Sequence, residues 1–131
     1  MSRVRVLLAD DHEAILEEVR ALLQAEFDIV GAVNNGQEAV SEVCRLAPDV
    51  LVIDISMPIM DGLQTASRLR SSNCRTKILF LTVHQDQDYV SAALAAGASG
   101  YVTKSQLSTD LVPAIHEVLL GHTFVSQIVS K

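Results

Sequence analysis

The sequence predicts a doubly wound α/β domain, in which helices cover both faces of a five-stranded parallel sheet. Three observations predict this class. Short runs rich in branched apolar residues alternate with segments of helical spacing about five times along the chain. The runs are apolar nearly throughout, as is typical of strands covered on both faces. The chain has 131 residues and 49% hydrophobic content, which suits a single domain with one core.

The strand set has four strong members and a weaker fifth. They are residues 4–10 (VRVLLAD), 28–33 (DIVGAV), 49–54 (DVLVID), 77–82 (KILFLT) and, more weakly, 100–104 (GYVTK). Parallel strands need crossover connections, which are almost always right-handed. Strand and helix alternation therefore places helices on both faces of the sheet.

The connecting segments carry apolar residues at helical spacing, so each presents one apolar stripe. The third segment, residues 63–73 (LQTASRLRSSN), has the fewest apolar positions to bury. Gly97 and Gly121 suit left-handed helix ends. The other stripes are Ile15, Val19, Leu22 and Leu23; Ala39, Val40, Val43 and Leu46; Val90, Ala93 and Leu94; and Leu111, Ile115, Val118 and Leu119.

Charge and composition exclude several classes of function. Sixteen acidic against ten basic residues give a net charge of -6, which disfavours direct binding of this domain to nucleic acid. Cys44 and Cys74 match no CxxC or zinc spacing, and the N-terminus lacks a secretory pattern. No apolar run approaches the roughly 18 to 20 residues of a membrane-spanning helix. These features predict a cytoplasmic protein without membrane partners.

Polar residues gather at the predicted carboxyl ends of the strands. Asp10 and Asp11 follow the first strand, Asp54 ends the third, Thr82 ends the fourth and Lys104 follows the fifth. Ligands of open α/β sheets bind beyond these ends. Carboxylates about 5 Å apart repel by about 3 kcal/mol per pair at an effective dielectric near 20, so a cation should accompany them. Oxygen ligands of this kind are those that Mg²⁺ selects.

The same convergence suggests a chemistry. With Mg²⁺ held by Asp10, Asp11 and Asp54, a free carboxylate oxygen of Asp54 could attack phosphorus and form an acyl phosphate. Thr82 and Lys104 would donate to the phosphoryl oxygens. A lone aspartate at a strand end is more simply a turn or capping residue, and only the combination favours a site.

Several separated motifs together carry a family resemblance. ADD at 9–11, VIDISMPIMDG at 52–62, LT at 81–82 and AGASGYVTK at 96–104 resemble the receiver domain of two-component response regulators, with its flavodoxin-like (CheY-like) fold. The resemblance spans residues 3–121 and leaves 122–131 as a C-terminal linker. DDH followed later by AGASGYVTKS further resembles the NarL/FixJ branch, in which a LuxR-type helix-turn-helix domain follows the receiver.

The resemblance implies a phosphoacceptor and its metal site. Asp54 would accept a phosphoryl group from a sensor histidine kinase or phosphotransfer protein. Asp11, Asp54 and the backbone carbonyl of Ser56 would bind Mg²⁺ or Mn²⁺, with Asp10 acting through bound water. The chain would then be a signalling module and not an enzyme, controlling transcription through a DNA-binding domain that these 131 residues do not include.

The resemblance also implies a switch. Thr82 and Lys104 would bind the phosphoryl oxygens, and the ring of Tyr101 would turn inward. The face built from the fourth helix, fifth strand and fifth helix would change shape and could form a homodimer.

Residues next to the predicted site would modify the access of phosphate and the shape of the loop after Asp54. Val83 replaces the small residue usual in the family and should narrow the approach to Asp54. Ser56 and His84 occupy places that tune water attack on the acyl phosphate, while Pro58 and Gly62 shape the loop after Asp54. Ser105 replaces the proline that many receivers place after the lysine, which leaves the isomer of the Lys104–Ser105 peptide open.

Two alternative functions remain at the level of sequence. A receiver could act without phosphate, as a dimerisation or interaction module, and Val83 gives this alternative weight. An aspartate-nucleophile phosphatase is disfavoured because such enzymes carry DxD after the first strand. Rossmann-type nucleotide binding is excluded more firmly, since LLADDH places acids where phosphate needs the amides of a glycine-rich turn.

Overall fold

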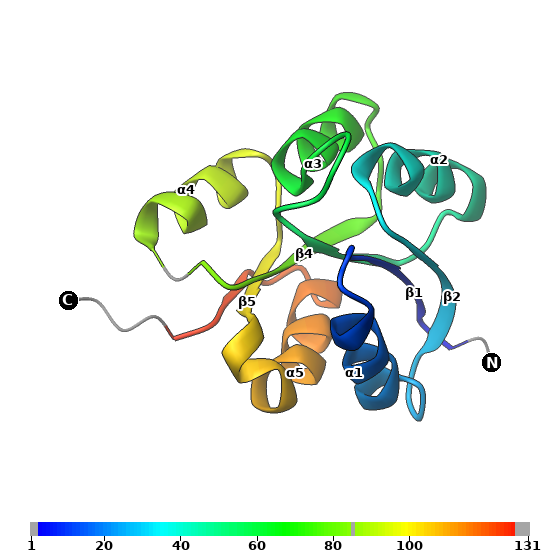
Figure 1. Cartoon of the computed structure of the whole chain (residues 1–131), viewed down its shortest axis with the longest axis vertical. Helices are drawn as coiled ribbons and strands as arrows, with labels where there is room; N and C mark the ends of the chain where they lie inside the picture. The colour runs from blue at the N-terminus through cyan, green and yellow to red at the C-terminus, as the bar shows by residue number, and fades with distance from the viewer. Residues whose placement is uncertain (1–2, 85, 128–131) are drawn as a thin grey trace.

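The computed structural model describes residues 3–84 and 86–127, and these form a parallel sheet between two helical layers (Figure 1). The strand order is β2-β1-β3-β4-β5-β6, and every pair is parallel. The strands are β1 (Arg5–Ala9), β2 (Asp28–Val33), β3 (Val50–Asp54), β4 (Lys77–Thr82), β5 (Gly100–Thr103) and β6 (Phe124–Val125). The predicted doubly wound α/β class is confirmed.

Helices cover both faces of this sheet. The helices are α1 (Glu13–Leu23), α2 (Gly36–Leu46), α3 (Gly62–Ser71), α4 (Gln87–Ala95) and α5 (Leu107–Leu119), with a 3₁₀ turn, η1 (Lys104–Gln106), before the last. Figure 1 shows α2, α3 and α4 on one side and α1 and α5 on the other. Two buried apolar clusters correspond to these layers, because one includes Ala39, Leu69 and Val90 and the other includes Val19 and Ile115.

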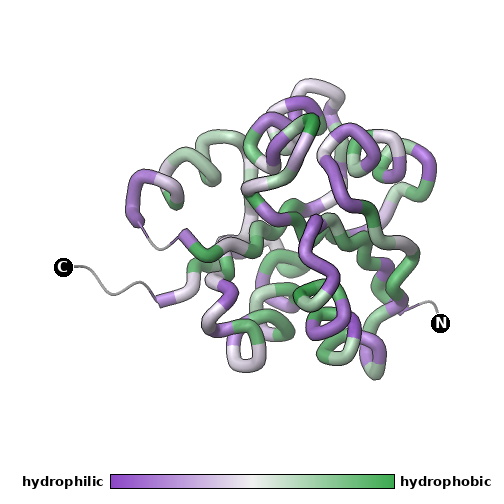
Figure 2. The backbone as a smooth tube through the Cα atoms, in the orientation of Figure 1, coloured by the Kyte–Doolittle hydropathy of each residue, from purple (hydrophilic) through white to green (hydrophobic). Residues whose placement is uncertain are grey.

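The strands are apolar because both of their faces are buried. All five residues of β3 are buried, and so are four of the five in β1. Figure 2 shows hydrophobic positions concentrated along the central strands, while the helices carry both kinds. A non-alternating apolar run is the expected sequence of such a strand.

The sheet has six strands, not the five predicted. Phe124 and Val125 pair with Gly100 and Tyr101 of β5 and so extend the edge of the sheet. Two residues are too few to show strand periodicity, so β6 could not be predicted from the hydrophobic pattern. These residues belong to the predicted linker, whose last four residues, 128–131, lie outside the described residues.

The register of the sheet aligns the strand ends that matter for the site. Ala9 pairs with Ile53, so Asp10 and Asp54, the next residue of each chain segment, lie beside one another. Asp54 pairs with Leu81, and Thr82 pairs with Thr103. Residues that end or directly follow β1, β3, β4 and β5 therefore meet at one edge of the sheet.

No helix in the described residues is both long enough and apolar enough to cross a membrane.

Candidate functional site: an acidic cluster at the carboxyl edge of the sheet

Asp10, Asp11 and Asp54 form an acidic cluster at the carboxyl edge. Ligand atoms of these residues and of His12 all lie within 4.8 Å of one another. Asp10 and Asp54 are buried, whereas Asp11 and His12 are exposed to solvent. The sequence-based prediction that the three carboxylates converge is confirmed.

Lys104 supplies the cation inside the protein. Its Nζ atom lies 3.0 Å from Oδ2 of Asp10 and 3.3 Å from Oδ2 of Asp54, and its side chain is only 8% exposed. Lys104 is the first residue of η1 and directly follows β5, so the backbone places it at the carboxyl edge of the sheet. A partly buried ammonium at this distance offsets part of the carboxylate repulsion.

Burial of Asp54 and its repulsion by Asp10 shift the pKa of its carboxyl group. Loss of hydration raises the pKa of its carboxyl group above the ordinary value, and the charge of Asp10 raises it further. Lys104 and the backbone N–H of Ser56, 3.4 Å from Oδ1, act in the opposite direction. Asp54 is thus a carboxylate whose ionised form is costly, a feature common at functional sites.

The cluster fits a hard divalent cation. Oδ2 of Asp10 and Oδ2 of Asp54 are buried and accept no well-aligned hydrogen bond among the described residues, although both ion-pair with Lys104. Buried carboxylate oxygens with spare lone pairs are the donors that Mg²⁺ takes, commonly with retained water. The exposed Asp11 leaves a side of the cluster open to solvent.

The loop after Asp54 is fixed by local hydrogen bonds. The N–H of Gly62 donates to the carbonyl of Ile55 at 2.7 Å, and Asp61 caps α3 by accepting from the N–H of Gln64. A Cβ at Gly62 would overlap the carbonyl oxygen of Asp54 and lie 2.8 Å from Cα of Ile55. Gly62 is therefore required by close approach of two backbone segments.

Ser56 and Pro58 are exposed in this loop. Together with Asp11 and Tyr89 they border a hollow beside the acidic cluster. Ile59, which follows Pro58, has φ +72° and is 76% exposed, so a residue with a branched side chain adopts the left-handed backbone conformation.

Thr82 and Tyr101 meet at the backbone of His84. Both side chains are fully buried; Oγ1 of Thr82 accepts from the N–H of His84 at 3.0 Å, and the Tyr101 hydroxyl donates to the His84 carbonyl at 2.8 Å. Burial raises the pKa of Tyr101 to about 12, although its hydrogen bond with Thr82 acts in the opposite direction. The structure thus links the end of β4 to the middle of β5, with the Tyr101 ring in the inward position.

Val83 and His84, two of the positions expected to tune access or dephosphorylation, directly follow β4. Val83 is 69% exposed. The His84 ring stacks on Tyr89 of α4, with centroids 3.9 Å apart and planes 7° apart. Peptide bonds among the described residues are all trans, including Lys104–Ser105.

Sequence reasoning missed His12. Histidines without a metal-binding spacing are usually solvent-exposed, and His12 is 58% exposed, yet its Nδ1 lies 2.8 Å from Oδ1 of Asp10. The sequence did contain one signal for this position of His12. Because His12 directly follows Asp10 and Asp11, its side chain stays within reach of both carboxylates.

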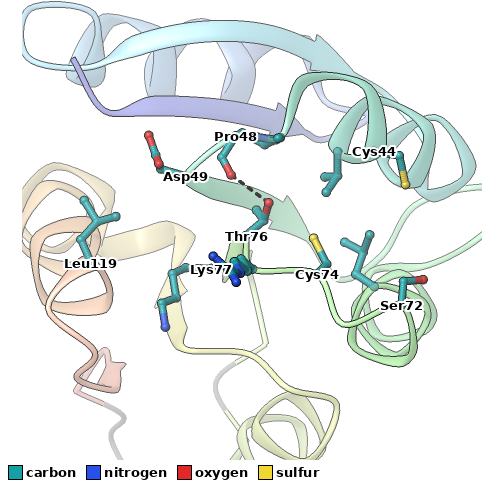
Figure 3. Close-up of a pocket in the computed structure, with 12 residues that line it drawn as sticks. Cys44, Pro48, Asp49, Ser72, Cys74, Thr76, Lys77 and Leu119 are labelled. Carbon is teal, nitrogen blue, oxygen red and sulfur yellow. Dashed lines mark hydrogen bonds between the residues drawn. The ribbon is translucent and has the colours of Figure 1, made fainter. Parts of the chain in front are cut away.

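A separate pocket lies at the opposite edge of the sheet, near the starts of β3 and β4. Cys44, Cys74 and Lys77 line it, and Oγ1 of Thr76 donates to the Pro48 carbonyl at 2.8 Å (Figure 3). It contains none of the acidic-cluster residues, and the candidate site is therefore the carboxyl edge.

The acid pair after β1, the buried aspartate ending β3 and the lysine after β5 meet at one edge of a doubly wound sheet, which is the arrangement of a receiver domain. The family model for the response regulator receiver domain matches residues 6–116, and the chain belongs to this family. Receiver domains are signalling domains that work with histidine kinases or phosphotransfer proteins and bind Mg²⁺ at an acidic pocket.

Relatives place the chain among NarL- and LuxR-type regulators. It is 33% identical over 124 residues to the nitrate/nitrite response regulator protein NarL of Escherichia coli, covering 93% of this chain and 57% of that protein. It is 34% identical over 125 residues to the oxygen regulatory protein NreC of Staphylococcus epidermidis, again covering 93% and 57%.

The crystal structure of a LuxR-family two-component response regulator from Aurantimonas is also similar. Its TM-score is 0.90 and its identity 33%, over 95% of this chain and 91% of that one. The chain spans between 53% and 61% of the length of the curated relatives it matches.

Proposed function

We propose that this receiver accepts a phosphoryl group on Asp54 from a sensor histidine kinase and so controls a downstream output. The observation that carries the proposal is a buried Asp54, with its raised pKa, that shares the Lys104 ammonium with the neighbouring Asp10. An acceptor needs a carboxylate oxygen and a cationic partner for the incoming phosphate, and both are present.

The transfer would run through one displacement. An Asp54 carboxylate oxygen forms the new O–P bond while the P–N bond of the kinase phosphohistidine breaks, and the electron pair of that bond returns to the imidazole. Lys104, already 3.3 Å from Asp54, would donate to a phosphoryl oxygen. Thr82 would donate to another after its hydroxyl leaves the N–H of His84.

Residues of the acidic cluster would hold Mg²⁺ during this step. Asp11, Asp54 and the Ser56 carbonyl are the proposed ligands, with Asp10 acting through water. A bound cation would neutralise the cluster and allow a phosphoryl anion to approach.

The output would follow from the link between the site and β5. Thr82 and Tyr101 share the His84 backbone, so withdrawing the Thr82 hydroxyl changes the contacts of a segment that the Tyr101 hydroxyl also binds. The face of α4, β5 and α5 would carry this change to a homodimer partner. In the cytoplasm, the final target would be a LuxR-type DNA-binding domain beyond these 131 residues.

Beryllofluoride, a phosphoryl analogue, tests this proposal. Fluorine NMR of the protein with Mg²⁺ and beryllofluoride should show a bound signal that Asp54→Asn abolishes. Asp28→Asn, an exposed aspartate at the start of β2, is the matched control and should leave the signal intact. A bound signal that persists in Asp54→Asn would assign the acceptor to another carboxylate, whereas no signal in the unaltered chain would favour the phosphate-independent interaction module.

A further inference from the structure

The imidazole of His12 lies inside the acidic cluster. Its Nδ1 atom is 2.8 Å from Oδ1 of Asp10, 3.3 Å from Oδ1 of Asp11 and 3.6 Å from Oδ2 of Asp54. These three residues carry the carboxylates of the proposed metal centre. Among the described residues, the cluster thus contains one nitrogen donor besides its oxygen donors.

Backbone contacts fix the position of His12. Its N–H donates to Oδ1 of Asp10 at 2.9 Å, and its carbonyl accepts from the N–H groups of Ile15 and Leu16, each at 3.1 Å. His12 is the residue directly before α1, so the start of that helix anchors it. The imidazole reaches the cluster from a backbone that is already ordered.

The cluster stays accessible at this point. The His12 side chain is 58% exposed and Asp11 is 35% exposed, whereas the side chains of Asp10 and Asp54 are 3% and 4% exposed. A cation entering from solvent therefore meets His12 and Asp11 first, and the buried oxygens of Asp10 and Asp54 afterwards.

We propose that His12 is a nitrogen ligand of this metal centre and raises its affinity for transition-metal cations relative to its affinity for Mg²⁺. This inference rests on the metal site of the proposed function. Imidazole favours ions such as Co²⁺, Ni²⁺ and Zn²⁺, while an all-oxygen set suits Mg²⁺. Coordination uses the lone pair of Nδ1, so the proton through which Nδ1 contacts Oδ1 of Asp10 in the metal-free protein would move to Nε2 or be released to solvent.

A different role for the imidazole makes the opposite prediction. If His12 only neutralised the carboxylates, a metal would have to displace it, and its removal would strengthen binding of every divalent cation. A ligand role instead predicts that removing His12 weakens binding of the transition metals while Mg²⁺ binding stays nearly constant.

Metal titration without a phosphoryl donor separates these outcomes. Affinities for Co²⁺ and Mg²⁺ would be measured by calorimetry for the unaltered chain, for His12→Phe and for His12→Gln. His122→Phe is the matched control, since His122 is exposed and pairs with Glu117 away from the cluster. The Co²⁺-to-Mg²⁺ affinity ratio should fall about tenfold or more in both His12 variants and stay constant in the control.

Spectroscopy supplies a second readout. Pulsed electron paramagnetic resonance of bound Mn²⁺ should show nitrogen coupling in the unaltered chain and lose it in both His12 variants. An unchanged affinity ratio, tighter Mg²⁺ binding in the variants, or absence of nitrogen coupling in the unaltered chain would overturn the proposal. Circular dichroism confirms that each variant is folded, and two different substitutions guard against a local defect.

Failure here is distinguishable from failure of the proposed function. The titrations contain no phosphoryl group, so they report His12 whether or not Asp54 accepts phosphate. Conversely, an oxygen-only centre with normal beryllofluoride binding would overturn the role of His12 alone.

Discussion

Replacing Asp54 by Asn should stabilise the metal-free protein. Asparagine keeps the size of the side chain and an oxygen that can accept from the N–H of Ser56, but it removes a buried negative charge. The proposed function and the stability of the fold oppose one another at this position, because the charge proposed to receive phosphate is costly to bury.

The size of the stability gain in Asp54→Asn follows from three electrostatic contributions that oppose one another. At an effective dielectric near 20, the repulsion between Asp54 and Asp10, whose oxygens lie within 4.8 Å, is about 3.5 kcal/mol. The attraction to Lys104 at 3.3 Å is about 5 kcal/mol. Removing a carboxylate from water costs several kcal/mol, which exceeds the difference. We expect a gain of about 1–2 kcal/mol in the free energy of unfolding.

The gain should depend on pH with a defined sign. The folded state raises the pKa of Asp54 above 3.8 through burial and Asp10. Below that unfolded value the residue is neutral in both states, and its contribution to stability is fully present. Stability is lost as pH rises through the folded pKa, so the advantage of Asp54→Asn should grow from about pH 4 and then level off.

Urea denaturation with a chelator at pH 4, 5, 6 and 7 measures this effect. Thermal denaturation at pH 7 should show a matching rise of roughly 3–8 °C in the midpoint temperature of Asp54→Asn. Asp28→Asn controls for the loss of a surface charge and should change stability by less than about 0.5 kcal/mol. An Asp54→Asn variant less stable than the unaltered chain at pH 7, or a pH-independent gain, would refute the electrostatic reasoning.

Three further predictions concern the loops around the site. Gly62→Ala should lower the free energy of unfolding by about 2–3 kcal/mol, because its Cβ would overlap the Asp54 carbonyl. Gly121→Ala is the control: Gly121 has φ +87° and open space around it, so urea denaturation should show a loss of only about 1 kcal/mol. Ile59→Asn should gain about 1 kcal/mol in thermal denaturation by relieving φ +72°, whereas Leu120→Asn, equally exposed at φ -82°, should gain nothing. Val83→Ala should raise the initial rate of labelling by a small phosphoryl donor severalfold without changing stability, and an unchanged rate would remove Val83 as an access residue.

The sequence was sufficient for the fold because its signals were redundant. Continuous apolar runs such as residues 49–54 indicated strands buried on both faces, and alternation with helices then determined parallel pairing. Strand ends could be located within about one residue, since Asp10, Asp54 and Thr82 each follow or end such a run. Convergence of Asp10, Asp11, Asp54 and Lys104 followed from that topology.

What the sequence could not provide depends on side-chain reach and on very short elements. The position of His12 depends on a backbone hydrogen bond to Asp10, and β6 is held partly by the hydroxyl of Ser126, which donates to Asp110 and accepts from the N–H of Thr103. Neither interaction has a periodic pattern. The link between Thr82 and Tyr101 through the His84 backbone likewise required coordinates.

Mapping the phosphorylated residue tests the central claim most directly. The chain would be treated with a small acyl phosphate and Mg²⁺, reduced with borohydride so that an aspartyl phosphate becomes homoserine, and sequenced by tandem mass spectrometry. The account predicts homoserine at position 54, dependent on Mg²⁺ and on the donor. Homoserine at Asp10 or Asp11 in its place, or no modified residue in a folded and metal-loaded sample, would contradict it.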